Sequence, residues 1–214
     1  MKPLSRIDDG STLQELGKAS IQIVHDLKNQ LNGLKLYATF LRRRIEKSER
    51  PEDEQQTIMK LIAGLDRAAN DLSLIVQYGR PIELKKQAGF DIQKAMRSIC
   101  SRLNETVVCE SDPEPVMGNV DPTKMTDAFS WISAGAVKFR PDDDSKVPVK
   151  VSVISDAREA TIEWSGLTTI DHDPFRSFAG SDEIRMSLAA KIIEAHGGSV
   201  QHDHNRLLAT LPLS

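Results

Sequence analysis

Residues 17–45 read GKASIQIVHDLKNQLNGLKLYATFLRRRI, and apolar side chains recur through this stretch at alternating steps of three and four. That spacing places them on one side of an α-helix and is typical of a helix packed in a bundle or coiled coil. The residues of this seam are Val24, Leu27, Leu31, Leu34, Ala38, Leu41 and Ile45. His25 lies one position off the seam, with Asn29 one turn further along, so we expect a polar stripe headed by an imidazole to face solvent.

A second segment repeats the same spacing after Pro51, at Ile58, Ile62, Leu65, Ala69, Leu72 and Val76. We expect the first helix to be capped by Ser11 or Thr12 and to run to about Glu49. Gly79-Arg80-Pro81 should end the second helix. Residues 1–10 are polar and charged, and we expect a flexible N-terminus there.

Two helices cannot enclose a core by themselves, so residues 11–82 are predicted to form a hairpin that dimerises as a four-helix bundle. Beyond residue 88 the pattern changes to mixed elements. We expect helices over 90–103, 121–139 and 182–196, and strands over 105–110, 115–120, 147–154, 160–164, 200–202 and 207–213. His196 would lie favourably at the negative end of its helix. The chain is therefore predicted to be α+β, with residues 88–214 forming an α/β sandwich whose helices cover one face of a mixed sheet.

Composition narrows the classes of partner and compartment. A net charge of -3 over 214 residues argues against nucleic acid as the main partner. Cys100 and Cys109 have neither the CxxC spacing of a metal site nor the number needed for a disulfide framework, which favours a reducing cytoplasm. Because no apolar run reaches the ~18 residues of a membrane span and no signal peptide opens the chain, we expect a soluble, cytoplasmic protein.

The segment VHDLKNQLNGL, residues 24–34, resembles the phosphoacceptor box of two-component histidine kinases. Residues 11–81 resemble the dimerisation and phosphotransfer domain of that family, and residues 90–214 are similar in element order to its ATP-binding domain. The most specific parts are the H-D-x-x-N pentad and the EAHGG segment near the carboxyl end. Phe175 and Phe178 resemble the paired phenylalanines of the same domain.

This resemblance implies roles for residues of the first helix. His25 would be the phosphoacceptor, Asp26 a general base or orienting carboxylate, and Asn29 the residue that positions the phosphoryl group or a water. Receiver domains of response regulators would be the partners.

The docking surface for such a receiver is predicted on the exposed side of the first helix, around Lys28, Asn32 and Lys35, with the facing turn of the second helix. Charges there would tune encounter rate and partner choice more than final affinity.

The nucleotide motifs depart from the family in three places. Aligning AVKF at 136–139 with the usual end of the first motif puts Gly135 where the magnesium-binding asparagine belongs. The segment EWSGLTTID has one glycine, Gly166, and no aspartate before it to accept from adenine. Anchoring on HGG puts Glu183 and Arg185 where glycines normally let the backbone approach the triphosphate. The resemblance therefore implies that ATP binding is lost, with no tightly bound cofactor or metal and with Mg²⁺ supplied by the partner receiver.

Two features outside these motifs have two interpretations each. His202 and His204 alternate like a metal pair, but a plain polar hairpin is the favoured interpretation. Trp131 and Trp164 are expected in the core of the second domain, although Trp131 could instead fill the emptied nucleotide pocket.

The sequence thus favours a homodimeric histidine phosphotransferase that relays a phosphoryl group between response-regulator aspartates through His25 without autophosphorylation. One alternative is an active sensor kinase core with a divergent ATP site. Another is a non-catalytic receiver-binding scaffold, or a phosphatase acting through Asn29.

Overall fold

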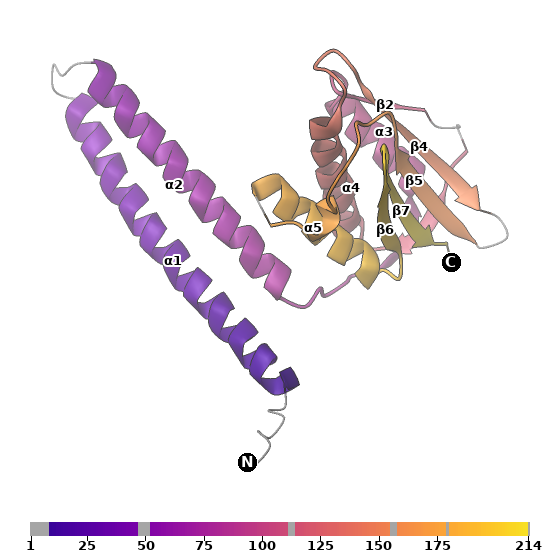
Figure 1. Cartoon of the computed structure of the whole chain (residues 1–214), viewed down its shortest axis with the longest axis horizontal. Coiled ribbons are helices and arrows are strands. Elements are labelled where there is room, and N and C mark those ends of the chain that lie inside the picture. The colour runs from indigo at the N-terminus through magenta and orange to yellow at the C-terminus, as the bar shows by residue number, and fades with distance from the viewer. Residues whose placement is uncertain (1–8, 47–51, 111–113, 155–157, 179, 214) are drawn as a thin grey trace, which may run out of the picture. The chain divides into compact units, whose positions relative to one another are not determined.

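A computed structural model describes residues 9–46, 52–110, 114–154, 158–178 and 180–213 of the chain (Figure 1). Within the helices, the side chains of residues 9–23, 25, 26, 44, 46, 52, 53 and 55 lie outside this description. The chain divides into two compact units, Met1–Arg80 and Pro81–Ser214. Among the described residues, no helix is long and apolar enough to cross a membrane.

The first unit is a hairpin of two long helices, α1 (Asp9–Glu46) and α2 (Glu52–Gly79), which lie side by side along their length (Figure 1). The helix starts earlier than predicted, so Asp9 and Gly10 are helical and Ser11 and Thr12 lie inside α1 rather than at its cap. Residues 47–49, where we expected α1 to end, fall outside the described residues.

The predicted seam of α1 divides into two rows. Ala38 is buried and Val24, Leu31 and Ile45 are half-buried, as expected for positions facing α2. The alternate seam positions Leu27, Leu34 and Leu41 remain 44%, 54% and 52% exposed. One hairpin therefore covers only one of the two apolar rows that the heptad pattern provides.

The second unit is built on a five-stranded mixed sheet in the order β2-β4-β5-β7-β6. Its strands are β2 (Val107–Cys109), β4 (Val147–Ile154), β5 (Glu159–Trp164), β6 (Ser199–Asp203) and β7 (Arg206–Pro212). The pair β2 and β4 is parallel, and the other neighbours are antiparallel. Burial alternates along the central strand β5, where Ala160, Ile162 and Trp164 are fully buried and the residues between them are not, so one face carries the core.

Three helices supply the other side of that core: α3 (Ile92–Arg102), α4 (Pro122–Ala136) and α5 (Ser181–Ala195). Two short 3-10 helices, η1 (Val137–Phe139) and η2 (Pro174–Arg176), follow α4 and precede α5. Asp121, the first residue of the helix predicted over 121–139, caps α4: its carboxylate accepts the Lys124 backbone N–H at 3.1 Å, and Pro122 opens the helix. The α4 and α5 helices pack closely against each other, and this pairing forms the region discussed below.

The predicted helix over 90–103 was wrong at its beginning. Phe90 and Asp91 belong to a strand, β1 (Gln87–Asp91), which pairs antiparallel with β3 (Met117–Val120) in a separate two-stranded sheet. The helix begins only after Asp91, whose carboxylate accepts the Lys94 backbone N–H at 3.0 Å. Gly89 has φ +79 within the irregular register of β1, a backbone conformation that glycine adopts without strain.

Candidate functional site

The H-D-x-x-N pentad lies in the middle of α1, which holds its members at fixed helical spacing. The side chains of His25 and Asp26 lie outside the described residues, so their chemistry stays a prediction. Asn29 is exposed one turn beyond His25, and Asn32 is exposed beyond it. Residues three and four apart share a helix face, so the polar stripe predicted from the sequence follows this side of α1.

The predicted docking residues differ in their surroundings. Lys28 and Lys35 are both half-buried, and the Lys35 ammonium forms an ion pair with Asp66 of α2. Both partners of that pair are over 40% exposed, so it contributes little to stability, but it gives the lysine a fixed place on the hairpin. Lys35 therefore belongs to a surface made by both helices.

Apolar side chains that the sequence analysis missed continue the exposed side of α1. Leu36, Tyr37 and Phe40 are 55%, 69% and 55% exposed. Leu36 and Phe40 follow Asn32 at successive steps of four, so the polar stripe runs into an apolar patch. The signal was present in the sequence as large apolar residues off the seam.

The region beside Gly135 is filled by a side chain from the neighbouring helix. Met186 of α5 is only 2% exposed and lies directly against Gly135 of α4. A Cβ atom at Gly135 would lie 2.7 Å from Met186 Cγ and would collide with its Sδ. Glycine at this position is therefore required by the packing of α4 on α5, and no larger side chain fits while Met186 keeps its place.

A second internal contact occupies the region near Gly166. Trp164, two residues before this glycine, is fully buried at the end of β5. Its indole Nε1 donates a hydrogen bond to Ser133 Oγ of α4 at 2.9 Å. Trp131, which could have filled the pocket, is only half-buried, so Trp164 is the tryptophan that reaches deepest into this core.

Charged side chains cover the beginning of α5. Lys138 Nζ lies 2.9 Å from Asp182 Oδ2 and 3.5 Å from Glu183 Oε1, and Arg185 Nη1 donates to Asp182 Oδ1 at 2.9 Å. The hydrogen bond between Lys138 and Asp182 is the main cause that lowers the pKa of Asp182 and raises the pKa of Lys138. The first turn of α5 thus carries two carboxylates, which are favourable at the positive end of the helix and are paired with Lys138 and Arg185.

Gly135 is the position at which the kinase resemblance implied a missing magnesium ligand. Position 135 carries no side-chain oxygen, and the Met186 thioether lies beside it. The Ser133 hydroxyl is already bonded to the Trp164 indole. Across the described part of the chain, no three His, Cys, Asp or Glu side chains are grouped so that they could hold a metal ion.

No family model matches the sequence, and no curated protein matches it. Solved structures do match. Full-length ShkA in complex with AMPPNP superposes with a TM-score of 0.66 at 16% identity, over 90% of this chain and 45% of ShkA. The Acinetobacter baumannii histidine kinase AdeS gives 0.58 at 15% identity, over 89% of this chain and 98% of AdeS.

The chain has a histidine kinase-like fold. The mycobacterial sensor histidine kinase MprB adds a match at TM-score 0.50 and 16% identity, over 59% of this chain and 97% of MprB. The histidine kinase-like chain spans less than half of ShkA. At these identities the similarity concerns the fold alone.

His196, in the EAHGG segment of this histidine kinase-like chain, lies at the C-terminal end of α5 as predicted, but it is buried there. It is 4% exposed, and burial, the main cause, lowers its pKa from 6.5. Its Nε2 accepts the Asp121 backbone N–H at 2.9 Å, while Nδ1 lies 2.7 Å from the Ile192 carbonyl and donates to it. Accepting at Nε2 requires the neutral imidazole, so His196 joins the end of α5 to the beginning of α4 rather than interacting as a cation with the helix dipole.

That junction extends toward the first residues of the second unit. The Lys85 backbone N–H donates to Asp121 Oδ2 at 2.9 Å, and the Asp121 pKa is lowered by this and neighbouring backbone hydrogen bonds, which outweigh its burial. The Asp121 carboxylate therefore caps α4 and holds the segment before β1, and the backbone N–H of the same residue donates to His196.

The remaining candidates from the sequence are two histidines near the end of the chain and the paired phenylalanines. His202 lies in β6 and His204 in the turn that leads to β7, as expected for a hairpin. His202 Nδ1 is 3.7 Å from a carboxylate oxygen of Asp173. Phe175 is buried and Phe178 is 51% exposed, so the two phenylalanines do not share one environment.

Proposed function

We propose that this chain is a histidine phosphotransferase of a two-component phosphorelay. His25 takes a phosphoryl group from the aspartate of one response regulator and passes it to the aspartate of another, without autophosphorylation from ATP. The observation that carries the proposal is the packing of Met186 against Gly135, which places a buried side chain where the kinase resemblance calls for a magnesium ligand. A chain that combines an intact phosphoacceptor box with such a substitution at the magnesium position suits a protein that obtains its phosphoryl group from a partner.

The transfer step needs only groups that α1 and a receiver domain supply. A ring nitrogen of the neutral His25 imidazole attacks the phosphorus of the aspartyl phosphate, the P–O bond to that aspartate breaks, and its carboxylate leaves. Asp26 orients the imidazole and stabilises the positive charge that develops on the ring. Asn29, exposed one turn further, contacts the phosphoryl oxygens. Transfer to the second receiver is the same displacement in reverse, and Mg²⁺ comes with the receiver.

The charge of α1 favours an acidic partner. Residues 27–45 contain Lys28, Lys35, Arg42, Arg43 and Arg44 and no acidic residue. Phosphorylated receiver sites gather carboxylates and phosphate, so such a helix raises the rate of encounter. Leu36 and Phe40 then offer apolar area next to the polar stripe.

The exposed row Leu27, Leu34 and Leu41 supports the homodimer that the sequence predicts. Each of these side chains is at least 44% exposed in a single hairpin. A second copy that packs on this row would complete a four-helix bundle and bury it.

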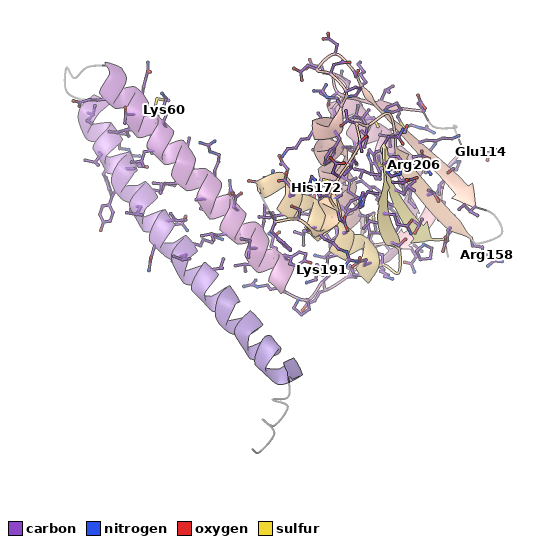
Figure 2. All side chains as sticks on the ribbon, in the orientation of Figure 1. Lys60, Glu114, Arg158, His172, Lys191 and Arg206 are labelled. Carbon is purple, nitrogen blue, oxygen red and sulfur yellow. The ribbon has the colours of Figure 1, made fainter. Side chains whose placement is uncertain are left out.

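Radiolabelled transfer tests the proposal. The full chain is incubated first with γ-labelled Mg-ATP alone and then with a labelled, phosphorylated receiver domain. We expect no label from ATP, and label from the receiver that disappears in the His25→Ala variant. His172→Ala is the matched control, because His172 is an exposed histidine of the second unit (Figure 2) and should leave labelling unchanged. Label from ATP alone, or none from any receiver, would refute the phosphotransferase.

An active kinase core is the second candidate, favoured by the fold similarity to ShkA, which was solved with AMPPNP. It requires nucleotide affinity. Calorimetry with Mg-ATP and a non-hydrolysable analogue separates the two functions, since the phosphotransferase should give no heat of binding at millimolar nucleotide. A receiver-binding scaffold is the third candidate. It predicts that His25→Ala keeps the signalling output in cells, whereas the phosphotransferase predicts that the output is lost.

A further inference from the structure

Cys100 and Cys109, which the sequence assigned to no site, are brought together by the chain reversal after α3. Cys100 lies in the last turn of α3, and Cys109 ends β2. The reversal occupies residues 103–106, where the backbone N–H groups of Thr106 and Val107 both donate to the Leu103 carbonyl at 2.8 Å. Each cysteine is three residues from this turn, on elements that pack against each other.

The two thiols also face the same interior space. Val107 is buried, Val108 is 41% exposed and Cys109 is half-buried, so the alternation along β2 puts Cys109 on the face that carries the core. Cys100 is 5% exposed and shares the buried side of α3 with Ile99 and other core residues. The interaction of the two thiols is one of the causes that raise the pKa of Cys100.

The two cysteines differ in access to solvent. Burial and the neighbouring Cys109 raise the pKa of Cys100 to about 12, so Cys100 stays a thiol at neutral pH. Cys109 is only half-buried and lies on β2, an edge strand of the sheet. A buried thiol beside a reachable one is the arrangement of a resolving and a reacting cysteine.

We propose that Cys100 and Cys109 form a reversible oxidation site, where hydrogen peroxide converts the two thiols into an internal disulfide. The Cys109 thiolate attacks one peroxide oxygen, the O–O bond breaks, and a sulfenic acid forms with release of one water. The Cys100 sulfur then attacks the Cys109 sulfur, the S–O bond breaks, and the departing hydroxide takes the Cys100 proton as a second water. Two thiols are oxidised, and one peroxide is reduced to two waters.

This site is independent of phosphotransfer, because it lies wholly within the second unit. The bond would tie α3 to the edge strand β2 and close a short loop. Cross-links of this kind restrict the unfolded chain, so the oxidised protein should unfold at a higher temperature than the reduced protein. Transient disulfides with such redox roles occur in otherwise reducing compartments.

Mass spectrometry of the full chain tests the proposal. The reduced protein is treated with hydrogen peroxide at increasing concentration, unreacted thiols are alkylated, and the intact mass and peptides are measured. We expect loss of the mass of two hydrogen atoms, disappearance of both alkylatable thiols together, and one peptide pair that joins Cys100 to Cys109. Dithiothreitol should restore both thiols.

Single serine variants separate the two roles. Cys100→Ser should accumulate a Cys109 sulfenic acid that dimedone traps, whereas Cys109→Ser should leave Cys100 unreacted at the same peroxide concentration. The wild-type measurement needs no variant to fold. Two free thiols after treatment, a disulfide between two molecules, or oxidation of Cys109 to sulfinic acid with Cys100 still free would each overturn the proposal.

Discussion

The contact between Gly135 and Met186 can be tested by a double-mutant cycle. Met186→Ala removes a buried side chain from between α4 and α5 and should cost about 2–5 kcal/mol of unfolding free energy. Gly135→Ala adds a methyl group that would collide with Met186, and overpacking of this kind costs about 1–3 kcal/mol. The higher helix propensity of alanine stabilises the variant by about 1 kcal/mol, so the net loss of unfolding free energy should be at most about 2 kcal/mol.

The double variant tests whether the side chains at positions 135 and 186 compete for the same space. Its new methyl group occupies space that Met186→Ala has vacated, so the Gly135→Ala penalty should vanish in that background. We therefore expect the double variant to be more stable than the sum of the two single changes by about 1–3 kcal/mol, within the range measured for residues in contact. Both tryptophans, Trp131 and Trp164, lie in the second unit, so urea unfolding followed by their fluorescence reports on this unit alone.

Gly64→Ala in α2 is the matched control. Nothing lies within 4 Å of the added Cβ there, so this change should cost nothing when unfolding is followed by circular dichroism. Additive free energies in the Gly135 and Met186 cycle would show that the two residues do not compete for one space. That result would count against the proposed loss of ATP binding.

Three further predictions concern buried hydrogen bonds, pH and assembly. Ser133→Ala leaves the Trp164 indole N–H without its acceptor and should cost about 1–3 kcal/mol of unfolding free energy in urea. Ser130 is only part-buried, so Ser130→Ala should cost less. Equal losses in the two variants would contradict a role for the buried hydrogen bond. The pKa of His196 is lowered in the folded state, so its contribution to stability is complete above its unfolded value of 6.5 and is lost as pH falls through the folded value. Wild type should therefore lose stability more steeply than His196→Gln below pH 6.5, and parallel urea midpoints across this range would refute the neutral imidazole. Leu34→Glu puts a charge in the exposed row of α1 and should convert a dimer to a monomer in light scattering, whereas an unchanged mass would argue against this row as the interface.

Local sequence signals predicted most of the secondary structure. The β4 range agrees with the prediction, and the N-cap signal of Asp121 followed by Pro122 gave the start of α4 correctly. Caps and glycine turns act over a few residues, so a single sequence is enough to read them. The start of α3 was predicted too early because Phe90 fits an apolar helix pattern as well as a strand. Only the pairing of β1 with β3 distinguishes the two.

The candidate site was predictable to the same extent. The H-D-x-x-N pentad and the substitutions at Gly135, Glu183 and Arg185 could be read directly from the sequence. The exposure of Leu36 and Phe40 could not, because periodicity says which residues share a face but not which face a partner covers.

The sequence by itself determined the two-part organisation, the helical spacing around His25 and the absence of kinase-type residues at the nucleotide motifs. Only the tertiary structure decided what occupies those positions: Met186 against Gly135, and the Ser133 hydroxyl bonded to a distant indole. It also decided that His196 is neutral and buried, and that two cysteines without a motif lie together. The physical reason is that caps and periodicity depend on neighbours in the chain. Burial, pKa and side-chain packing depend on residues that meet only when distant segments fold together.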